Sequence, residues 1–372
     1  MNMPQLVALD MPAGNQFLAA VLGVWDRGDA VFPLDQRLPA VAQFELISAM
    51  APASIIDASG NETSLPNARP VRNGDSLVIA TSGSSGSPKG VVHTHASMNA
   101  AAKSSNSRLG CTKDHHWLVC LPVSHVGGFS VITRALQSNS MLTMHPAFDA
   151  EEVIRSAGSG VTHVSLVRTA LQRIDPSIFL TVLLGGAAPP AEMPDNVVAT
   201  YGMTETFGGI FYNGIALDGV ETKIVDTEIL VRGPMMMRAF RDETTPFTAD
   251  GWLPTGDSGY FEDEKLVVNG RIGEMIISGG ENIWPNLLEQ TIAQHPLVSA
   301  VAVTGVADEE WGEKVVSWVV PQDPNNPPKL SDIREHVALT LPKFYCPKEL
   351  KILQSLPVTS LGKTDKRALP SS

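Results

Sequence analysis

The amino-acid sequence predicts an α/β protein, and two observations carry this prediction. Apolar runs typical of buried strands alternate with helical patterns up to Gly219, and such alternation is characteristic of sheets covered by helices. After Gly219 the pattern changes to short strand-like runs separated by turn residues. The chain has 372 residues, of which 43% are hydrophobic and 18% charged, so two or three domains with sizeable cores are expected.

The expected elements follow one another in this order. Strands are expected at Leu77–Ala80, Trp117–Leu121, Met141–Met144, Val161–Leu166, Thr181–Leu184 and Val197–Thr200, and helices at Ala150–Ala157 and Thr169–Arg173. Short antiparallel strands are then expected at Lys223–Val225, Glu228–Val231 and Lys265–Val268. A last segment starts near Arg271, with helices at Trp284–Gln294 and Leu330–Leu339 and strands at Ala300–Val306 and Lys314–Val320.

The composition limits the partners and the compartment. The formal net charge of −12 argues against nucleic acid and anionic membranes as partners, because binding phosphate requires a basic face. The three cysteines, Cys111, Cys120 and Cys346, have no spacing typical of metal ligands and are expected to fill the core. Their odd number suits a reducing compartment. We see no signal peptide, and the most apolar region is too polar to span a bilayer, so a cytoplasmic location is expected.

The most informative segment is the loop TSGSSGSPKG, Thr81–Gly90. Its amide N–H groups and hydroxyls can surround an anion, and Lys89 adds a positive charge for a phosphate oxygen. A flexible linker has a similar composition, but it needs no apolar run on each side. A Walker loop does not fit, because there the lysine precedes Ser or Thr at the start of a helix. The candidate phosphate-binding residues are Thr81, Ser82, Gly83, Ser84, Ser85, Gly86 and Lys89.

Two motifs allow both a structural and a ligand-binding interpretation. Gly185 and Gly186, at the end of an expected strand, would let the backbone lie close against a flat ligand or would form a tight turn. Asp257, between glycines, would cap a turn or accept hydrogen bonds from ribose hydroxyls, as acidic residues do in dinucleotide sites. The residues alone leave both choices open.

The motif TYGMTET carries three side chains suited to a nucleotide and its metal. Tyr201 could stack on a base, and Thr204 could donate a hydrogen bond to a phosphate. Glu205 could hold Mg²⁺, which prefers a carboxylate together with substrate phosphates. The alternative for Glu205 is a solvated helix residue.

The C-terminal part contains further candidates. Arg271 could contact ribose or phosphate, and Gly273 lies where a swivel could form, because glycine accepts large changes in φ and ψ. Ser278–Gly280 forms a second loop that could approach a ligand closely. Lys363 is either an exposed lysine or a functional one, and the nearby Lys366 and Arg367 make the choice ambiguous.

In their order and spacing, these motifs resemble the adenylate-forming superfamily of acyl- and aryl-CoA ligases, luciferases and peptide-synthetase adenylation domains. The resemblance runs from Leu77 to the C-terminus and includes LPVSHVGG (Leu121–Gly128), GGAAPP, YGMTE, TGD, GRIGEMIISGGENIWP and the final GK. It implies a large N-terminal domain, residues 1–271, with α/β sheets and a small β-subdomain. It also implies a mobile α+β domain, residues 272–372, that carries the catalytic lysine. ATP, Mg²⁺ and CoA are the implied cofactor and co-substrates.

The resemblance also implies a role for each motif residue. The loop Thr81–Lys89 would hold the β- and γ-phosphates, Thr204 would contact the α-phosphate, and Glu205 would hold Mg²⁺. The ribose would be bound by Asp257 and Arg271. The adenine would be surrounded by Gly185, Gly186, Ala187, Tyr201 and Gly202. Lys363 would stabilise the charge that develops during adenylation. A swivel at Gly273 would then replace Lys363 by Ser278, Gly279 and Gly280 for thioester formation. His125 would lie at the acyl pocket as a gate or carboxylate neighbour rather than a general base.

Within the superfamily the chain looks most like the short actinobacterial o-succinylbenzoate–CoA ligases of menaquinone synthesis. The matching segments are Thr162–Ile174 and Tyr201–Glu221, and the part before the Thr81 loop is trimmed relative to most relatives. The implied pocket needs an anchor for the spare carboxylate of the substrate. Arg168 is a candidate because a guanidinium suits a carboxylate, and a surface arginine is the equal alternative. The candidates for the ring slot are Val126, Phe207, Gly208 and Gly209.

Two alternatives to this function stay open at the level of sequence. The chain could activate another aryl or medium-chain acid, or it could be a stand-alone adenylation module that loads a carrier protein. A binding protein without turnover is disfavoured, because Lys89, Glu205, Asp257, Arg271 and Lys363 are all present. Gly273 replaces the Asp, Lys or Ser usual at the hinge, which leaves the resting conformer open. A homodimer is ordinary for the superfamily, but no residue argues for one.

Overall fold

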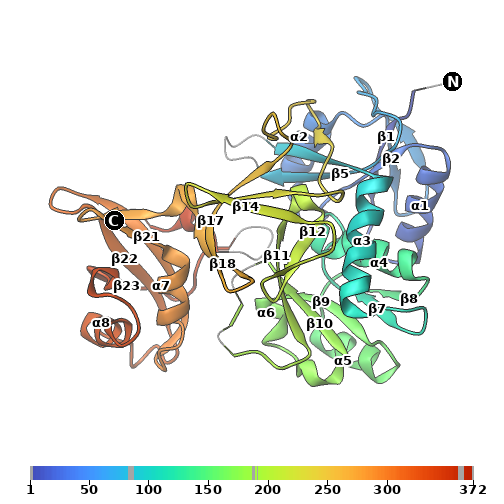
Figure 1. Ribbon diagram of the computed structural model, residues 1–372. Coiled ribbons are helices and arrows are strands. Elements are labelled where there is room, and N and C mark those ends of the chain that lie inside the picture. The colour runs from blue at the N-terminus through green and yellow to red at the C-terminus, as the bar shows by residue number, and fades with distance from the viewer. Residues whose placement is uncertain (1–2, 83–87, 187–188, 191, 359–363, 371–372) are drawn as a thin grey trace. The chain divides into compact units, whose positions relative to one another are not determined.

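The computed structural model describes residues 3–82, 88–186, 189–190, 192–358 and 364–370. The chain forms two compact units. The first consists of the chain up to Pro189, Met193–Thr222 and Val231–Leu253, and the second of Pro190–Glu192, Lys223–Leu230 and the chain from Pro254 onward. Each unit is described separately below (Figure 1).

The first unit contains two seven-stranded sheets. The first sheet has the order β16-β6-β5-β2-β1-β3-β4. Its strands are β1 (Leu6–Asp10), β2 (Ala30–Pro33), β3 (Ser54–Asp57), β4 (Glu62–Ser64), β5 (Asp75–Ser82), β6 (Pro88–Thr94) and β16 (Ala239–Phe240). Strands β3, β1, β2 and β5 are parallel, and the strands at both sides of this group run antiparallel to their neighbours.

The second sheet of this unit has the order β13-β12-β11-β10-β9-β7-β8. Its strands are β7 (His116–Val119), β8 (Met141–Met144), β9 (His163–Val167), β10 (Thr181–Gly185), β11 (Val197–Met203), β12 (Gly208–Tyr212) and β13 (Ile215–Ala216). Strands β8, β7, β9, β10 and β11 are parallel. Their carboxyl ends therefore lie along one edge, which is where ligands bind in open α/β sheets.

Helices cover both sheets in layers. The helices are α1 (Asn15–Asp26), α2 (Ala40–Met50), α3 (His95–Leu109), α4 (Val126–Ser138), α5 (Ala150–Gly158) and α6 (Arg168–Leu171). Side chains alternate between the faces of a strand, so Val7 and Leu9 of β1 enter a central core with α1, α3, α4 and the second sheet. Leu6 and Ala8 instead face α2. On the far face of the second sheet, α5 and α6 pack against Leu118 and its neighbours (Figure 1).

The second unit contains two smaller sheets. The four-stranded sheet has the order β14 (Glu221–Val225), β15 (Glu228–Arg232), β17 (Leu253–Glu262) and β18 (Lys265–Arg271). The five-stranded sheet consists of β20 (Glu281–Ile283), β19 (Ile276–Ser278), β22 (Gly312–Pro321), β21 (Val298–Asp308) and β23 (Glu349–Ile352). Helices α7 (Pro285–Ile292) and α8 (Leu330–Ala338) share a core with this second sheet.

Every strand and helix expected from the sequence is present, with ends that differ by a few residues. Strand β11 continues through Tyr201 to Met203, and β9 begins at His163 rather than Val161. The α/β class is confirmed. None of the helices in the described part of the chain is both long and apolar enough to cross a membrane.

Candidate active site

The carboxyl edge of the second sheet brings four of the expected motifs together. His125 follows β7, Arg168 follows β9, Gly185 ends β10, and Thr204 follows β11. Because these strands are parallel and adjacent, residues far apart in sequence meet along one edge. The sequence signals are therefore consistent with one site.

Two glycines on this edge are required by close backbone contacts. A Cβ on Gly202 would lie 2.6 Å from the carbonyl carbon of Gly208 and 2.8 Å from the Cα of Gly209. A Cβ on Gly185 would lie 2.9 Å from Oγ1 of Thr200, which donates a hydrogen bond to the Leu184 carbonyl. The surface here is bare backbone, which allows a flat group to lie close. Gly186 has a φ of 85°, and Ala187 lies outside the described residues.

The turn at Thr204 and Glu205 is fixed by its backbone. Thr204–Thr206 forms a 3₁₀ turn, so Glu205 is a half-buried turn residue and not a solvated residue of an α-helix. The Glu205 carbonyl accepts a 2.7 Å hydrogen bond from the Met237 amide. Tyr201, on the strand before the turn, lies 6.0 Å from the ring of Phe211.

His93 supports this turn and was missed by the sequence analysis. Its Nε2–H donates a 2.7 Å hydrogen bond to the Thr204 carbonyl, and its ring packs edge-on against Phe207. His93 is fully buried, and burial lowers its pKa to about 4, although the bond to Thr204 opposes this shift. The histidine is therefore neutral at pH 7. In the sequence it lies in VVHTH, directly after the phosphate-loop motif. The only sign of a structural role was that it lies in an apolar, strand-like segment.

The Gly/Ser loop connects two antiparallel strands, β5 and β6. Gly83, Ser84, Ser85 and Gly86 lie outside the described residues, and of Ser82 only the backbone is described. Thr81 and Lys89 face each other across the two strands, and the Thr81 hydroxyl donates to the Lys89 carbonyl at 3.3 Å. Lys89 is exposed, with Nζ 5.0 Å from the centre of the Phe240 ring. The strand pairing thus places the lysine opposite the start of the loop.

His125 belongs to a charged cluster with Asp35 and Arg37. Its Nε2 lies 3.2 Å from Oδ2 of Asp35 and 2.9 Å from Nη2 of Arg37, and Arg37 pairs with Asp35 at 2.6 Å. Burial would raise the pKa of Asp35, but hydrogen bonds from Arg37 and His125 outweigh it and hold the pKa well below its usual range. An imidazole held against an ionised carboxylate and a guanidinium is positioned by them.

The candidates for the ring slot lie between α4 and β12. A Cβ on Gly208 would lie 3.9 Å from Oγ of Ser130 in α4, so the glycine backbone faces this helix. Val126 begins the same helix and is half-buried, and Phe207 is buried in a left-handed conformation with φ 54°. Gly209 has no room for a side chain, because a Cβ would lie 2.8 Å from that of Thr200.

Arg134, one turn beyond Ser130, is a second residue that the sequence analysis missed. Its side chain is buried, Nε donates to Oγ of Ser105 at 3.0 Å, and Nη1 donates to Oγ of Ser165 at 3.3 Å. The guanidinium also lies 5.3 Å from the centre of the Trp117 ring. Within the described ranges it has no carboxylate partner, although buried charges are normally paired. The sequence did contain a signal for this residue, because Arg134 is a charged residue inside the apolar pattern of α4.

Arg168 has a different environment. It is the first residue of α6 and is partly exposed. No side-chain hydrogen bond or ion pair of Arg168 occurs with any residue whose position is described. No described residue therefore holds its side chain in one orientation through a hydrogen bond or ion pair.

In the second unit, Asp257 and Arg271 form a preformed ion pair. They are opposite each other on β17 and β18, and Nε of Arg271 lies 2.9 Å from Oδ1 of Asp257. The Arg271 Nη1 donates to the Thr255 carbonyl at 2.8 Å. Asp257 is buried inside a strand, so the expectation of a turn-capping aspartate is wrong.

The remaining candidates also lie in the second unit. Ser278 ends β19, and Gly279 and Gly280 form the turn to β20 with φ of 61° and 84°, as expected for a two-residue hairpin loop. Gly273 lies in a 3₁₀ turn, with open space where a side chain would be. Lys363 lies outside the described residues.

The segment after Lys363 is attached to the body of the second unit. Nζ of Lys366 lies 2.9 Å from Oε1 of Glu289 in α7 and 3.6 Å from Oε2 of Glu274. Glu289 is buried, which raises its pKa, while Lys366 opposes this shift. Lys366 therefore links the chain next to Lys363 with the turn that contains Gly273.

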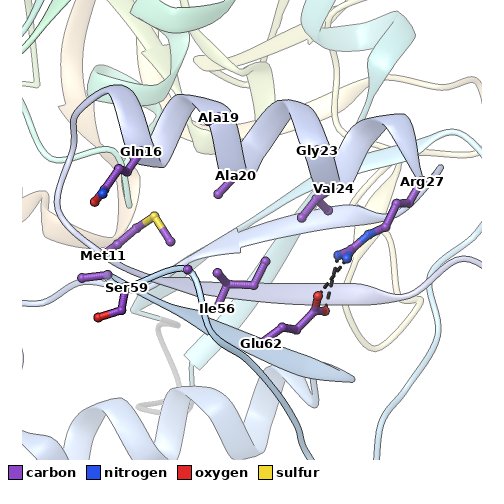
Figure 2. Close-up of a pocket in the computed structure, with 12 residues that line it drawn as sticks. Met11, Gln16, Ala19, Ala20, Gly23, Val24, Arg27, Ile56, Ser59 and Glu62 are labelled. Atoms are coloured by element: carbon purple, nitrogen blue, oxygen red, sulfur yellow. Dashed lines mark hydrogen bonds and ion pairs between the residues drawn. The ribbon is translucent and has the colours of Figure 1, made fainter.

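A groove elsewhere in the first unit is separate from these motifs. It lies between α1 and the β3–β4 hairpin, with Ala20, Val24 and Ile56 among its lining residues (Figure 2). Arg27 and Glu62 close one end with a 2.8 Å ion pair. None of the candidate residues on the described part of the chain lines it.

Comparisons with known proteins identify the family of the chain. The model of the AMP-binding enzyme family matches residues 46–240, and that of the AMP-binding enzyme C-terminal domain matches residues 287–363. The chain is 35% identical over 320 residues to a probable 2-succinylbenzoate–CoA ligase of Mycobacterium tuberculosis, covering 79% of this chain and 83% of the relative. It is 33% identical over 336 residues to 2-succinylbenzoate–CoA ligase of Bacillus cytotoxicus, covering 78% of this chain and 69% of that protein.

Solved structures show the same fold. The o-succinylbenzoate CoA synthetase of Bacillus subtilis in complex with the acyl-adenylate intermediate OSB-AMP superposes with a TM-score of 0.87 at 25% identity, covering 100% of this chain and 89% of that one. The same enzyme in complex with ATP and magnesium ion gives a TM-score of 0.86 at 25% identity, with 99% and 90% covered. With both family models matched and relatives aligned over most of their length, the chain belongs to the AMP-binding enzymes, the adenylate-forming superfamily.

Proposed function

We propose that this protein is an AMP-forming acid–thiol ligase that converts o-succinylbenzoate to o-succinylbenzoyl-CoA in menaquinone biosynthesis. A carboxylate oxygen of the acid attacks the α-phosphorus of ATP, and the bond to pyrophosphate breaks. The CoA thiol then loses its proton and attacks the acyl carbonyl, and AMP leaves. The observation that carries the proposal is the 35% identity to a probable 2-succinylbenzoate–CoA ligase across 83% of that relative.

The carboxyl edge of the first unit would bind the phosphates and the adenine of the nucleotide. Thr81–Lys89 would hold the leaving pyrophosphate, and the bare backbone at Gly185, Gly186 and Gly202 would accept the adenine, with Tyr201 and Ala187 beside it. The Asp257 carboxylate suits two ribose hydroxyls, and Arg271 already orients it at 2.9 Å. The half-buried Glu205 fits Mg²⁺, which would neutralise phosphate charge when bound. Thr204 would donate to the α-phosphate from a turn that His93 holds in place.

The two half-reactions would use different parts of the second unit. We propose a division at residues 271 and 272 with a swivel at Gly273, where nothing lies within 4 Å of the position that a Cβ would take. In the first conformer Lys363 stabilises the charge on the α-phosphate. In the second, the Ser278–Gly280 turn approaches the thiol. The Lys366–Glu289 ion pair would position the segment that carries Lys363.

Lys363→Ala tests whether Lys363 acts in adenylation only and not in thioester formation. It should abolish adenylation, measured as ATP–pyrophosphate exchange, and leave thioester formation from supplied acyl-adenylate largely intact. Arg367→Ala, a nearby change of the same size and charge, is the matched control and should affect neither reaction strongly. Equal loss of both half-reactions in the Lys363 variant would contradict the swivel.

The acid would be held in the slot between α4 and β12. Gly208, Gly209, Val126 and Phe207 would accept the ring, with His125 close to the reacting carboxylate. The substrate has a spare carboxylate, and Arg134 is better suited to it than Arg168. Arg134 is a buried, oriented guanidinium without a carboxylate partner among the described residues, whereas Arg168 would lose side-chain freedom on binding.

The decisive experiment is ATP–pyrophosphate exchange over a panel of o-succinylbenzoate, benzoates and medium-chain fatty acids, followed by CoA consumption on the active acids. Exchange should be strongest with o-succinylbenzoate. Exchange only with simple benzoates or fatty acids would refute the substrate, and transfer only to a carrier protein would refute CoA as the acceptor. ATP and CoA as co-substrates support a cytoplasmic location, and size-exclusion chromatography with light scattering would test for a homodimer.

A further inference from the structure

The opposite edge of the second sheet contains a cluster of a thiol and two imidazoles. Cys111 follows α3, His115 precedes β7, and His163 is the first residue of β9. One possible ligand atom from each of the three lies within 4.8 Å of the others. Strands β7 and β9 are parallel, so this amino edge lies at the other end of the strands from His125 and Arg168. The cluster thus lies at the opposite strand ends from His125 and Arg168, while Arg134 of the proposed acyl pocket is close enough to act on Cys111.

His163 brings a buried ring nitrogen without a hydrogen-bond partner among the described residues to this cluster. It is fully buried, and its Nε2 has no hydrogen-bond partner among the described residues. The Thr162 hydroxyl lies 2.8 Å from Nδ1 of His163, accepts the His116 amide at 2.9 Å and donates to the His116 carbonyl at 3.2 Å. When the hydroxyl donates its one proton to that carbonyl, Nδ1 of His163 donates to the hydroxyl and Nε2 carries the free lone pair. A buried, unpaired acceptor requires an explanation, such as an ion.

The other two residues of the cluster, Cys111 and His115, are partly exposed. Burial raises the pKa of the Cys111 thiol to about 11, while the charge of Arg134 opposes this shift. The ring of His115 lies 4.7 Å from that of His163, and its Nδ1 accepts the Thr112 amide at 2.9 Å. That hydrogen bond is exposed, so water can replace it when His115 turns a lone pair toward the other two groups.

We propose that Cys111, His115 and His163 form a zinc site with one position left for water. A thiolate and two imidazoles are ligands that favour Zn²⁺ over Mg²⁺ or Ca²⁺. Bonds of about 2.0–2.3 Å place tetrahedral ligand atoms roughly 3.5 Å apart, so side-chain movements suffice to close the site. Binding releases the thiol proton to solvent. The ion ties the loop after α3 to β9, and the Thr162 hydroxyl orients His163 in the manner of outer-shell partners.

Cobalt substitution tests the site without any measurement of catalysis. Metal-free protein is titrated with Co²⁺ in excess Mg²⁺ and without nucleotide, so that the outcome is independent of the proposed ligase activity. We expect one equivalent to bind, with a sulfur-to-cobalt charge-transfer band that Zn²⁺ removes. Cys111→Ser should lose this band, whereas Cys346→Ser, a change at a buried cysteine of the second unit, should keep it. No band in the parent protein, or a band that survives Cys111→Ser, would overturn the proposal.

A second variant separates binding from misfolding. His115→Gln changes a partly exposed side chain and should fold, as judged by its circular dichroism spectrum. Loss of a residue that only supports a ligand typically costs about 10–100-fold in metal affinity, so loss of the ligand His115 itself should lower the Zn²⁺ affinity by at least about tenfold. Zn²⁺ should also raise the Tm of the parent protein and not that of Cys111→Ser. Equal affinity in the parent and in His115→Gln would exclude this ligand set.

Discussion

The two edges of the second sheet are built by different constraints. At the carboxyl edge, a Cβ on Gly202 would collide with the backbone of Gly208 and Gly209, and one on Gly185 would meet Oγ1 of Thr200. His93 fixes the turn at Thr204. At the amino edge, Cys111 and His163 meet through their side chains alone. A site built on backbone contacts requires particular residues in fixed order and so leaves a motif. A cluster that is formed only by side chains can be gained or lost through one substitution, so it leaves no sequence motif.

Gly202→Ala should produce the largest effect on the carboxyl edge. The new Cβ would overlap the Gly208 backbone, which cannot move without disrupting β12, and such overpacking costs about 3 kcal/mol. We expect this loss in urea unfolding and no detectable pyrophosphate exchange. Gly158→Ala in α5 is the matched control, because its Cβ meets nothing within 4 Å; it should change stability by at most about 1 kcal/mol. A stable, active Gly202→Ala protein would show that the backbone contacts are not required.

Arg134→Met should have the next largest effect, on substrate binding. Leaving one partner of a buried charge pair alone costs about 3 kcal/mol, so the KM for o-succinylbenzoate should rise about 100-fold. The KM for ATP should be unchanged. Arg168→Met is the matched control, and its KM should change less than about fivefold, as for an exposed charge. A larger increase in KM for o-succinylbenzoate in Arg168→Met than in Arg134→Met would identify Arg168 as the residue that binds the spare carboxylate.

The sequence predicted the five parallel strands of the second sheet, β7 to β11, and the order of the site motifs, because these depend on local patterns. Asp257 shows the limit of this approach: flanking glycines suggested a turn, but pairing with β18 keeps it inside a strand. Helix α3 was missed because HASMNAAAKSSNSRL has little apolar periodicity. Its stability comes from packing between two sheets, which no local pattern records.

The functional residues that were missed act across long sequence separations. His93 reaches the carbonyl of Thr204, 111 residues away, and Arg134 reaches Ser165 on another strand. His163 lies far from Cys111 in sequence, so the absence of metal-ligand spacing among the cysteines gave no indication of the cluster. Such contacts depend on how strands are ordered in the sheet, and this order is a property of the fold.

Acid should weaken the carboxyl edge through His93. The pKa of this histidine is lowered by burial from 6.5 to about 4, so the folded protein excludes a proton that the unfolded chain binds. The contribution of neutral His93 to the free energy of unfolding is therefore complete above pH 6.5. It decreases by about 1.4 kcal/mol per pH unit as the pH falls from 6.5 to about 4. Urea unfolding at pH 7 and pH 5 measures this loss. His93→Gln cannot take up the proton and should lose correspondingly less; an equal loss would assign the acid sensitivity to other groups.

Thr162→Val should give the smallest effect and is confined to the amino edge. The substitution keeps the shape of the side chain but removes the hydroxyl that is hydrogen-bonded to Nδ1 of His163, so the imidazole loses the partner that fixes its orientation and tautomer. Loss of such an outer-shell partner lowers metal affinity about tenfold, which Co²⁺ titration would detect. The control is Thr143→Val, which removes the hydroxyl beside His116 on the neighbouring strand and should leave Co²⁺ affinity unchanged. If both variants bind Co²⁺ like the parent, the hydroxyl of Thr162 does not orient a ligand, and the amino edge is held by packing alone.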